Sequence, residues 1–450
     1  MASPIVKSII QVYRKLGRAS LKPSSSAAGS CSPCGKIVMV SQYYVPFPST
    51  TSRYMTEIAE ELAKDSKVIV ISGAPGSASQ VPLEPRKPEI IEIKSWWPGK
   101  GALVSRSFAD MLFSIQALLA VLRHARSEDV LLTVTAPFTL PYAVALATRL
   151  RKSAAVLIMH DLYPDSLVMA GMLRASSLLT RSLRALNRLM FARLDGIIII
   201  GRDMAPKLLA YPKVSAAKLS LIPNWASMAA GYREVSDNNP FRQRAGGQFI
   251  VAMSGNAGYT HDPLTVLEAA RLLQDRKDIR FLLSGHGVGW SRIKEMHAAS
   301  PCPNVSLVER VPDSELEDFL AAGDVWVVPY RKNNTGVSVP SRIYNIFAVG
   351  RPVIVCSERD AEAALLLEEE DIGWVTPPEN PRALADAILL AASDAAQTTK
   401  KGRRAAEVAS RYTANASLGA YRDLMERLLA HQRTRNRHSL EQIALRRPGS

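Results

Sequence analysis

The sequence predicts an α/β protein with two doubly wound parallel sheets and a cleft between them. Apolar runs typical of buried strands alternate with amphipathic segments typical of helices. The alternation forms two successive series, one before and one after Ile222-Pro223-Asn224. The length of 450 residues is sufficient for two or three domains. We therefore expect two Rossmann-like domains joined near residue 223.

The first series begins at Lys36. Its expected strands are Ile37–Val40, Val68–Ile71, Ile90–Ile93, Val130–Val134, Ala154–Met159 and Gly196–Ile200. Its expected helices include Ser52–Lys64, Phe108–Arg123 and Leu140–Leu150. Each strand is a short, nearly continuous apolar run, as in a parallel sheet that helices cover on both faces.

The second series follows Asn224. Its expected strands are Phe249–Met253, Arg280–Ser284, Val305–Val308, Val325–Val328, Val353–Cys356 and Trp374–Thr376. Its expected helices include Pro263–Arg276, Ser314–Ala322 and Pro381–Ala392, with a last helix at Ala414–Leu429. The two domains are thus residues 36–222 and 223–400. We expect a helical segment, 401–432, to return to the first domain, and a basic tail, 433–450, to be disordered.

Residues 1–35 differ in composition from the rest of the chain. Apolar residues recur at helical spacing between lysines and arginines, no acidic residue precedes Glu57, and a Ser/Ala/Gly-rich linker follows. A basic amphipathic helix on a linker is typical of a membrane-surface element. A transit peptide and an extension from a misplaced start codon are equally open alternatives.

Composition limits the classes of partner and compartment. The formal net charge of +15 indicates a polyanionic partner such as nucleic acid, an anionic membrane or phosphorylated substrates. Four cysteines in this length do not form a disulfide framework, which indicates a reducing compartment. No run of eighteen apolar residues predicts a membrane-spanning helix.

The stretch from Gly336 to Val355 is the most informative part of the chain. A glycine-bearing loop leads into a short amphipathic segment, which ends at Gly350 and is followed by an apolar strand. Backbone N–H groups at the start of such a segment favour phosphate. Ser338 and Ser341 add hydroxyl donors, and Arg342 adds a cation. This pattern predicts a cradle for a nucleotide diphosphate, although a solvated helix residue is the alternative for Arg342.

Six segments in the expected order resemble glycosyltransferase family 4, which has the GT-B fold. They are Lys36–Pro46, Met159–Ser166, Ile222–Asn224, Ser254–Gly258, Ser284–Gly287 and Pro340–Asn345, and Gly373–Pro378 resembles the segment that follows the last of them. The closest subgroup by resemblance is the N-acetylfucosaminyl-type transferases of bacterial polysaccharide assembly. Each motif alone is weak, and their shared order carries the signal.

The resemblance implies an enzyme that transfers a sugar, with retention, from a nucleotide-diphosphate sugar, by expectation a UDP-sugar. The implied acceptor is lipid-linked or a polysaccharide, and neither a metal nor another cofactor is implied. Arg342 and the segment start would stabilise the leaving diphosphate in place of a metal. His160 would contact the donor sugar, and Asp161 would orient His160 or meet the acceptor. A helix cap is the structural alternative for Asp161.

Further candidates follow the strands of both domains. Gly255, Asn256 and Gly258 would let the main chain approach the diphosphate, and His261 is expected near the cleft. The other candidates are Arg310 and Val311 beside the base, Ser338, Pro340 and Ser341 at the donor, and Ser49, Thr50 and Arg53 at the acceptor phosphate. Ordinary turns and helix capping by Ser49 are the structural alternatives.

Two positions depart from the family pattern. Many members carry two glutamates separated by seven residues, where this chain has Val337 and Asn345. An asparagine can still bind the ribose hydroxyls, whereas valine cannot hydrogen bond. These departures favour one alternative function, a degenerate GT-B protein that binds nucleotide or partner without turnover. A nucleic-acid-binding protein and a sugar-nucleotide epimerase are weaker alternatives.

Two segments of the first domain suggest membrane contact. Residues 96–126 combine Trp96, Trp97 and basic residues with an apolar stripe, and residues 174–193 carry five arginines and no acidic residue. The structural alternative is a core helix packed on the sheet. We expect peripheral contact with the inner face of an anionic cytoplasmic membrane and no nucleic-acid partner.

Overall fold

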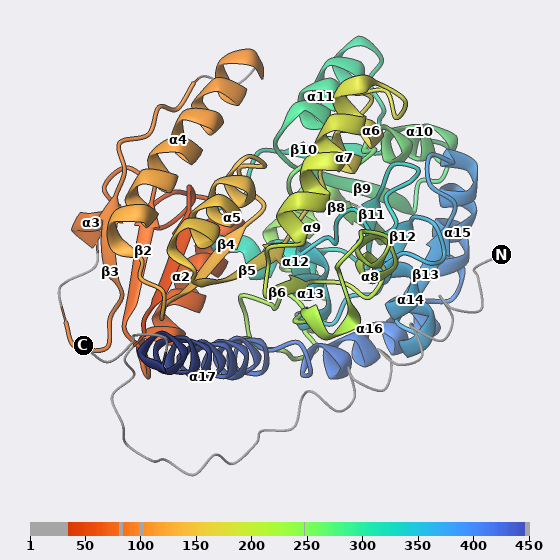
Figure 1. Ribbon diagram of the computed structural model, residues 1–450. Helices are drawn as coiled ribbons and strands as arrows, with labels where there is room; N and C mark the ends of the chain where they lie inside the picture. Colours follow the sequence, from red (N-terminus) through yellow and green to blue (C-terminus); the bar gives the residue numbers. More distant parts are fainter. Residues whose placement is uncertain (1–34, 81–83, 99–102, 247, 446–450) are drawn as a thin grey trace.

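The computed structural model describes residues 35–80, 84–98, 103–246 and 248–445. It contains two parallel sheets in two domains, as the sequence predicts (Figure 1). The amphipathic extension predicted for residues 1–35 lies outside the described residues except for Gly35.

The first sheet has seven strands, all paired in parallel. In spatial order they are β3 (Glu89–Glu92), β2 (Val68–Ser72), β1 (Ile37–Ser41), β4 (Val130–Val134), β5 (Ala154–Met159), β6 (Gly196–Ile199) and β7 (Leu219–Leu221). The short β7 was not expected from the sequence, because Leu219-Ser220-Leu221 is too brief to give a periodic signal.

The second sheet has six strands, also all parallel. In spatial order they are β10 (Val305–Val308), β9 (Ile279–Ser284), β8 (Phe249–Met253), β11 (Val325–Pro329), β12 (Val353–Cys356) and β13 (Gly373–Thr376). In both sheets the strand order reverses once along the chain, at β1/β4 and at β8/β11.

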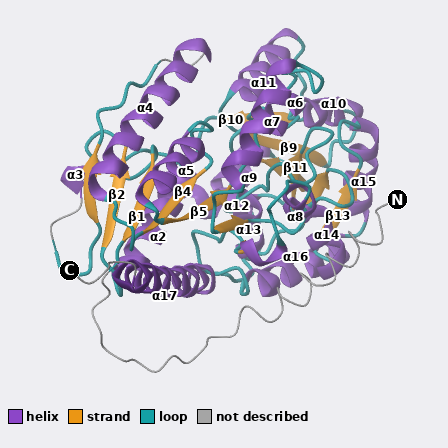
Figure 2. Ribbon diagram, viewed as in Figure 1, coloured by secondary structure: helices purple, strands orange, loops and turns teal. Residues whose placement is uncertain are grey.

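Helices cover both faces of each sheet (Figure 2). The first domain contains α2 (Thr50–Ala63), α3 (Ser77–Gln80), α4 (Leu103–His124), α5 (Leu140–Arg151), α6 (Asp165–Met169), α7 (Leu178–Phe191) and α8 (Met204–Leu209). The second contains α9 (Pro240–Ala245), α10 (Leu264–Leu272), α11 (Val288–Ala299), α12 (Leu316–Ala322), α13 (Arg342–Ala348), α14 (Glu362–Glu370), α15 (Pro381–Ser393) and α16 (Ala395–Ala409). Short 3₁₀ helices lie at Ala216–Lys218 and Asp313–Glu315.

The strands alternate their side chains between two cores in each domain. In β1, Val38 and Val40 face the core shared with α4, α5 and α7, whereas Ile37 and Met39 face the core shared with α2. Both sets are fully buried, because helices exclude water from both faces of the sheet. This explains why the strands read as continuous apolar runs.

The last helix, α17 (Ala414–Leu445), leaves the second domain and packs on the first. Leu418, Tyr421 and Met425 join the core beside α2, and Gln432 donates to the carbonyls of Ser127 and Lys152. Figure 1 shows α16 and α17 in line along one edge of both domains. The return to the first domain therefore begins at residue 414, since α16 packs against α13 of the second domain.

The expectation of a disordered tail from residue 433 is corrected, because α17 continues to Leu445. Residues 446–450 lie outside the described part. The polar contacts near the start of this stretch, such as Asn436 Nδ2 to Ser127 Oγ at 3.3 Å, anchor the helix where the sequence offered only scattered arginines.

Candidate active site

The loops at the switch point of the second sheet meet through Arg342. Arg342 follows β11 and begins α13, and its guanidinium donates to the carbonyls of Ser254 and Asn256, which follow β8. Ligands of open parallel sheets bind beyond the carboxyl ends of strands at such a reversal. The structure thus brings Arg342 and the Gly255 turn together, and their role in binding a diphosphate stays a prediction.

The backbone conformation at position 255 favours glycine. Its φ is +100°, and a Cβ there would lie 2.8 Å from Arg342 Cζ. Among the ion pairs of the described residues, none involves Arg342, and burial lowers its pKa to about 10. The guanidinium is thus a partly desolvated cation that main-chain oxygens hold, which suits it to an anionic ligand.

The loop of residues 334–341, which leads into Arg342, is bonded to the first domain. Leu162 N donates to Val337 O at 2.9 Å, and Asp161 and Ser338 form an antiparallel bridge. Val337 is fully buried and its own N–H donates to Asn334 O, so this position contributes to closing the domains. The carbonyl and N–H of Val337 are both used within the protein.

His160 and Asp161 lie at the carboxyl end of β5, as predicted. Their backbone N–H groups both donate to Thr135 Oγ1, at 3.1 and 3.2 Å, which fixes the end of the strand. Burial lowers the pKa of His160 to about 4 and raises that of Asp161 to about 6. At neutral pH the imidazole is therefore uncharged and the carboxylate is mostly ionised, a pair able to accept hydrogen bonds from a sugar.

His261 is a second, half-buried imidazole near Arg342. Its ring stacks on Tyr330 with 5.1 Å between centroids, and its Nδ1 lies 2.9 Å from Thr260 Oγ1. Its Nε2 is buried and has no hydrogen-bond partner. Burial and the positive charge of Arg342 together lower the pKa of His261 well below its usual value. His261 thus lies near Arg342, and its place in the cleft stays a prediction, whereas Tyr330 had no sequence signal.

The loop expected to meet the acceptor combines a helix cap with a half-buried cation. Ser49 is the N-cap of α2 and accepts from Ser52 N at 3.1 Å, so the capping alternative holds for this residue. Thr50 begins the helix and is exposed. Arg53 is half-buried over the ring of Tyr54, whose hydroxyl donates to Trp225 O at 3.0 Å. Burial raises the pKa of Tyr54, and Ser341 of the second domain is among the neighbours that oppose this rise. Arg53 therefore lies beside the donor loop.

Other predicted residues have structural partners of their own. Asn345 Oδ1 accepts from Ser227 N at 2.7 Å, which joins α13 to the interdomain segment. Arg310 is exposed after β10, and Val311 packs on the core of the second domain. Asn256 is exposed, and Gly258 lies in ordinary contact with it. Pro340 is buried between Ser338 and Ser341.

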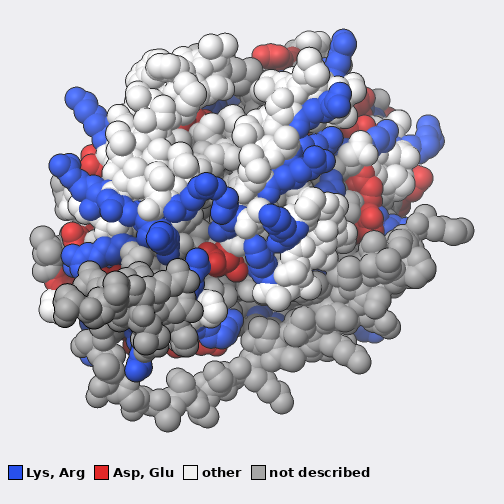
Figure 3. Space-filling view, viewed as in Figure 1, with Lys and Arg blue, Asp and Glu red and all other residues white. Residues whose placement is uncertain are grey.

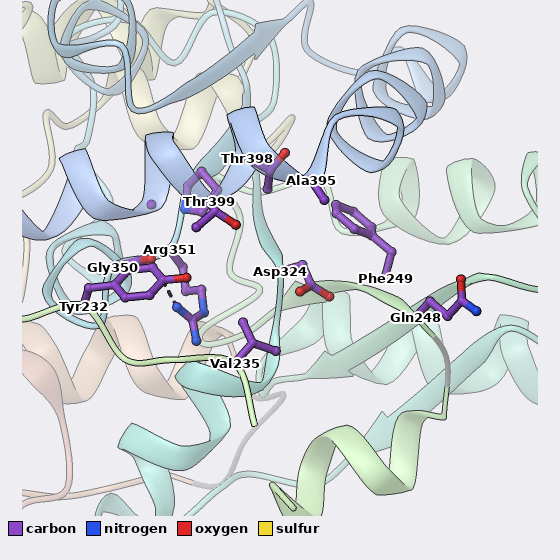
Figure 4. A pocket seen from close by; sticks show the side chains of 12 residues that line it. Tyr232, Val235, Gln248, Phe249, Asp324, Gly350, Arg351, Ala395, Thr398 and Thr399 are labelled. Carbon is purple, nitrogen blue, oxygen red and sulfur yellow. Dashed lines mark hydrogen bonds between the residues drawn. The ribbon is translucent and has the colours of Figure 1, made fainter. Parts of the chain in front are cut away.

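The described residues contain no group of three or more His, Cys, Asp or Glu side chains arranged to hold a metal ion. A separate hollow of about 90 Å³ lies at the opposite edge of the second sheet, near the starts of β8, β11 and β12 (Figure 4). Tyr232, Asp324 and Arg351 line it. Because it is at the amino ends of the strands, it is not part of the candidate site.

This arrangement of two facing parallel sheets, with a cation held between the β8 and β11 loops, defines a two-domain GT-B architecture. The family model for glycosyl transferase 4-like domains matches residues 49–225, and that for group 1 glycosyl transferases matches residues 248–394. The chain therefore belongs to the GT-B glycosyltransferases, and its first domain fits family 4.

Relatives and solved structures agree with this family. WbjE of Pseudomonas aeruginosa, named as a probable glycosyltransferase, is 28% identical over 358 residues, which is 78% of this chain and 88% of WbjE. WcaI of Escherichia coli, whose name assigns it to colanic acid biosynthesis, is 28% identical over 200 residues, 43% of this chain and 48% of WcaI.

Two solved structures have the same fold at low identity. Sucrose-phosphate synthase of Thermosynechococcus elongatus has a TM-score of 0.67 at 16% identity, covering 88% of this chain and all of its own. HepE of Anabaena, crystallised with UDP and glucose, has a TM-score of 0.62 at 16% identity, covering 88% and 99%.

Proposed function

We propose that this enzyme transfers a sugar from a UDP-sugar to a lipid-linked acceptor in bacterial polysaccharide assembly, with retention and without a metal. The observation that carries the proposal is the half-buried Arg342, held by the carbonyls of Ser254 and Asn256 at the reversal of the second sheet. The binding of UDP and glucose by HepE supports the donor, and the names of the relatives support a polysaccharide pathway.

In this proposal the departing diphosphate is neutralised by Arg342 and by hydroxyls of the same loop. Ser338 and Ser341 are both partly exposed beside it. Preorganised donors in a site with little water stabilise developing negative charge more than the same groups do in water. His160, uncharged at neutral pH, binds the donor sugar, and Asp161 binds either His160 or the acceptor hydroxyl.

A lipid-linked acceptor requires contact with a bilayer, and the first domain offers a suitable surface. We call this surface the outer face of α4, α5 and α7. Large apolar side chains are exposed on it, namely Val104, Phe108, Met111, Leu112, Ile115 and Leu119 on α4, Leu146 and Leu150 on α5, and Leu178, Leu179, Leu186 and Leu189 on α7. The three helices contain one acidic residue, Asp110.

Cations accompany these apolar side chains. Arg149, Arg151, Arg181 and Arg188 are exposed on α5 and α7, and Figure 3 shows basic side chains crossing this side of the molecule between uncharged regions. Apolar side chains next to arginines fit the boundary of an anionic bilayer, where each basic residue adds about 1 kcal/mol. We therefore assign this face to the anionic membrane surface.

The helix α4 could interact with the bilayer in two ways. Val104–His124 is long and apolar enough to cross a membrane by length and composition, and 28% of its apolar window is buried. However, Phe113, Ala117 and Val121 are part of the first-domain core and would have to leave it for the helix to span. We therefore propose that α4 lies along the membrane with its core side still packed.

The test of turnover uses purified protein, a panel of UDP-sugars and a bacterial lipid extract, with release of UDP as the readout. We expect UDP release with one of the sugars, at a rate that EDTA does not change. We also expect NMR to show that the product keeps the anomeric configuration of the donor. Tight UDP binding without UDP release from any sugar would favour the degenerate GT-B protein. Two observations agree with that alternative: Val337 is buried, and Asn345 Oδ1 already accepts from Ser227 N. Loss of activity with EDTA would contradict metal independence.

The test of the membrane surface is flotation with phosphatidylcholine vesicles, with and without phosphatidylglycerol. We expect binding to the anionic vesicles alone, weaker at high salt, and reduced several-fold by Phe108→Ser with Leu119→Ser. The matched control is Leu272→Ser with Leu390→Ser, two side chains similarly exposed on the second domain. An equal loss of vesicle binding in both pairs of variants would contradict this assignment. If the protein stays on the vesicles after a wash with alkaline carbonate, α4 spans the bilayer.

A further inference from the structure

The residues after β6 make a contact across the domain boundary. Arg202 and Asp203 lie between β6 and α8 and are only 8% and 5% exposed. Asp203 occupies the N-cap position of α8, where an aspartate commonly accepts from its own helix. Its carboxylate makes no such bond. The sequence therefore suggests a local cap, whereas the structure directs this carboxylate to the second domain.

Asp203 Oδ2 accepts two backbone N–H groups of the second domain. They are those of Gly336, at 2.9 Å, and Glu362, at 3.1 Å. Glu362 is the first residue of α14, so a first-domain side chain satisfies one of the free N–H groups at the start of a second-domain helix. Figure 1 shows α8 and α14 next to each other.

Glu362 makes the reciprocal contact. Its Oε2 accepts the backbone N–H of Arg202 at 2.6 Å, and the Nε of Arg202 donates to both oxygens of the same carboxylate, at 3.1 and 3.0 Å. Each domain thus supplies a carboxylate to the main chain of the other. We call Arg202, Asp203, Gly336 and Glu362 the interdomain box.

The position of Gly336 makes this contact specific. Its φ is +70°, and a Cβ there would lie 2.5 Å from the main-chain oxygen of Asp203. The next residue accepts from Leu162 N, so the 334–341 loop is bonded to the first domain at two places. That loop leads directly to Ser338, Ser341 and Arg342.

We propose that Asp203 is a positioning residue for the transfer reaction, because it holds the 334–341 loop in the shape that binds the donor only while the two domains are closed. The inference rests on the proposed function, since it assigns the donor diphosphate to that loop. A donor that requires the ordered loop then favours closure, and closure in turn favours the donor. Opening the cleft requires the interdomain box to break.

The test compares Asp203→Ala with Asp203→Asn, because asparagine keeps an oxygen that can accept from Gly336 and Glu362. The control is Asp195→Ala, which removes a carboxylate that accepts one backbone N–H, from Ala155, within the first domain. UDP affinity is measured by calorimetry, and hydrogen exchange of residues 334–341 by mass spectrometry. We expect Asp203→Ala to lose at least tenfold in affinity and to exchange faster in this loop.

Asp203→Asn is expected to stay within about threefold of the unaltered protein, and Asp195→Ala to leave both measurements unchanged. Unchanged loop exchange in Asp203→Ala, or an equal loss in Asp195→Ala, would overturn the proposal. If Asp203→Ala does not fold, Glu362→Ala tests the same box from the second domain, with faster exchange at 334–341 expected and unchanged exchange overturning it. If UDP binds neither the unaltered protein nor any variant, the proposed function fails. Hydrogen exchange of residues 334–341 then still decides whether Asp203 positions this loop.

Discussion

The switch points of the two sheets differ in what they offer a ligand. At β8/β11 the contacts are made by main-chain carbonyls, a glycine at φ +100° and one half-buried arginine. In the first domain, side chains predominate beyond the ends of β1 and β5, including Arg53 over the ring of Tyr54 and the uncharged imidazole of His160. Under the proposed function, the donor diphosphate would be bound by a site that backbone contacts hold in shape, whereas the acceptor would meet side chains.

Gly336→Ala is the change expected to have the largest effect, because it alters the backbone of the 334–341 loop that leads to Arg342. A Cβ would meet the main-chain oxygen of Asp203 at 2.5 Å, and main chain cannot move aside as a flexible side chain can. We expect kcat/KM for the donor to fall by about a hundredfold, equivalent to about 2.7 kcal/mol. The control is Gly171→Ala, because Gly171 has a φ of +73° but a Cβ there would have no atom within 4 Å. An equal fall in kcat/KM in this control would attribute the effect to backbone strain alone.

Arg342→Ala should have the next largest effect, on donor binding. Loss of a desolvated, charge-assisted contact to phosphate typically costs about 1.5–3 kcal/mol, which is about tenfold or more in UDP affinity. Calorimetry with UDP measures it, with Arg292→Ala, an exposed arginine of α11, as the control. Unchanged affinity in Arg342→Ala would remove this residue from the site.

Arg53→Ala should affect the other substrate. Arg53 is half-buried, so a contact to an acceptor phosphate is partly screened, and we expect the acceptor KM to rise about threefold to tenfold. UDP affinity should not change, the reverse of the pattern for Arg342→Ala. A change in UDP affinity instead would mean that both switch points serve the donor.

The last prediction concerns stability rather than activity, namely its pH dependence at Asp203. Burial, followed by the charge of Glu362, raises its pKa to about 7. The native state therefore holds this proton more tightly than the unfolded chain, and stability falls as pH rises from about 4 to about 7. Asp203→Asn removes this contribution, so its melting temperature relative to the unaltered protein should increase from pH 5 to pH 8. A pH-independent difference would contradict the raised pKa.

Much of the fold could be predicted from the chain, and some of the site. Several strands match the expected residues, among them Val130–Val134, Ala154–Met159 and Phe249–Met253, because continuous apolar runs identify strands buried on both faces. The position of Arg342 after a glycine-bearing loop was also predictable. Its carbonyl partners were not, since Ser254 and Asn256 are 88 and 86 residues away.

The interdomain box gave no sequence signal for the same reason. Asp203 and Glu362 are separated by 159 residues, and Asp203 precedes α8 as an ordinary N-cap would. Position 337 lacks the glutamate that the family resemblance leads us to expect there, and the structure uses the main chain of Val337 to bond Leu162. Pairings over such distances depend on how the domains pack, which local periodicity does not encode.

The sequence by itself determined the two sheets, the order of their elements and the presence of a basic, glycine-bearing loop before α13, because these depend on local hydrophobic periodicity and on residue types. The tertiary structure decided which groups that loop contacts, why positions 255 and 336 favour glycine, and that the carboxylate of Asp203 serves the other domain. These features arise only when distant main-chain groups are brought together and buried, since a buried N–H or carboxylate must then find a partner wherever the fold places one.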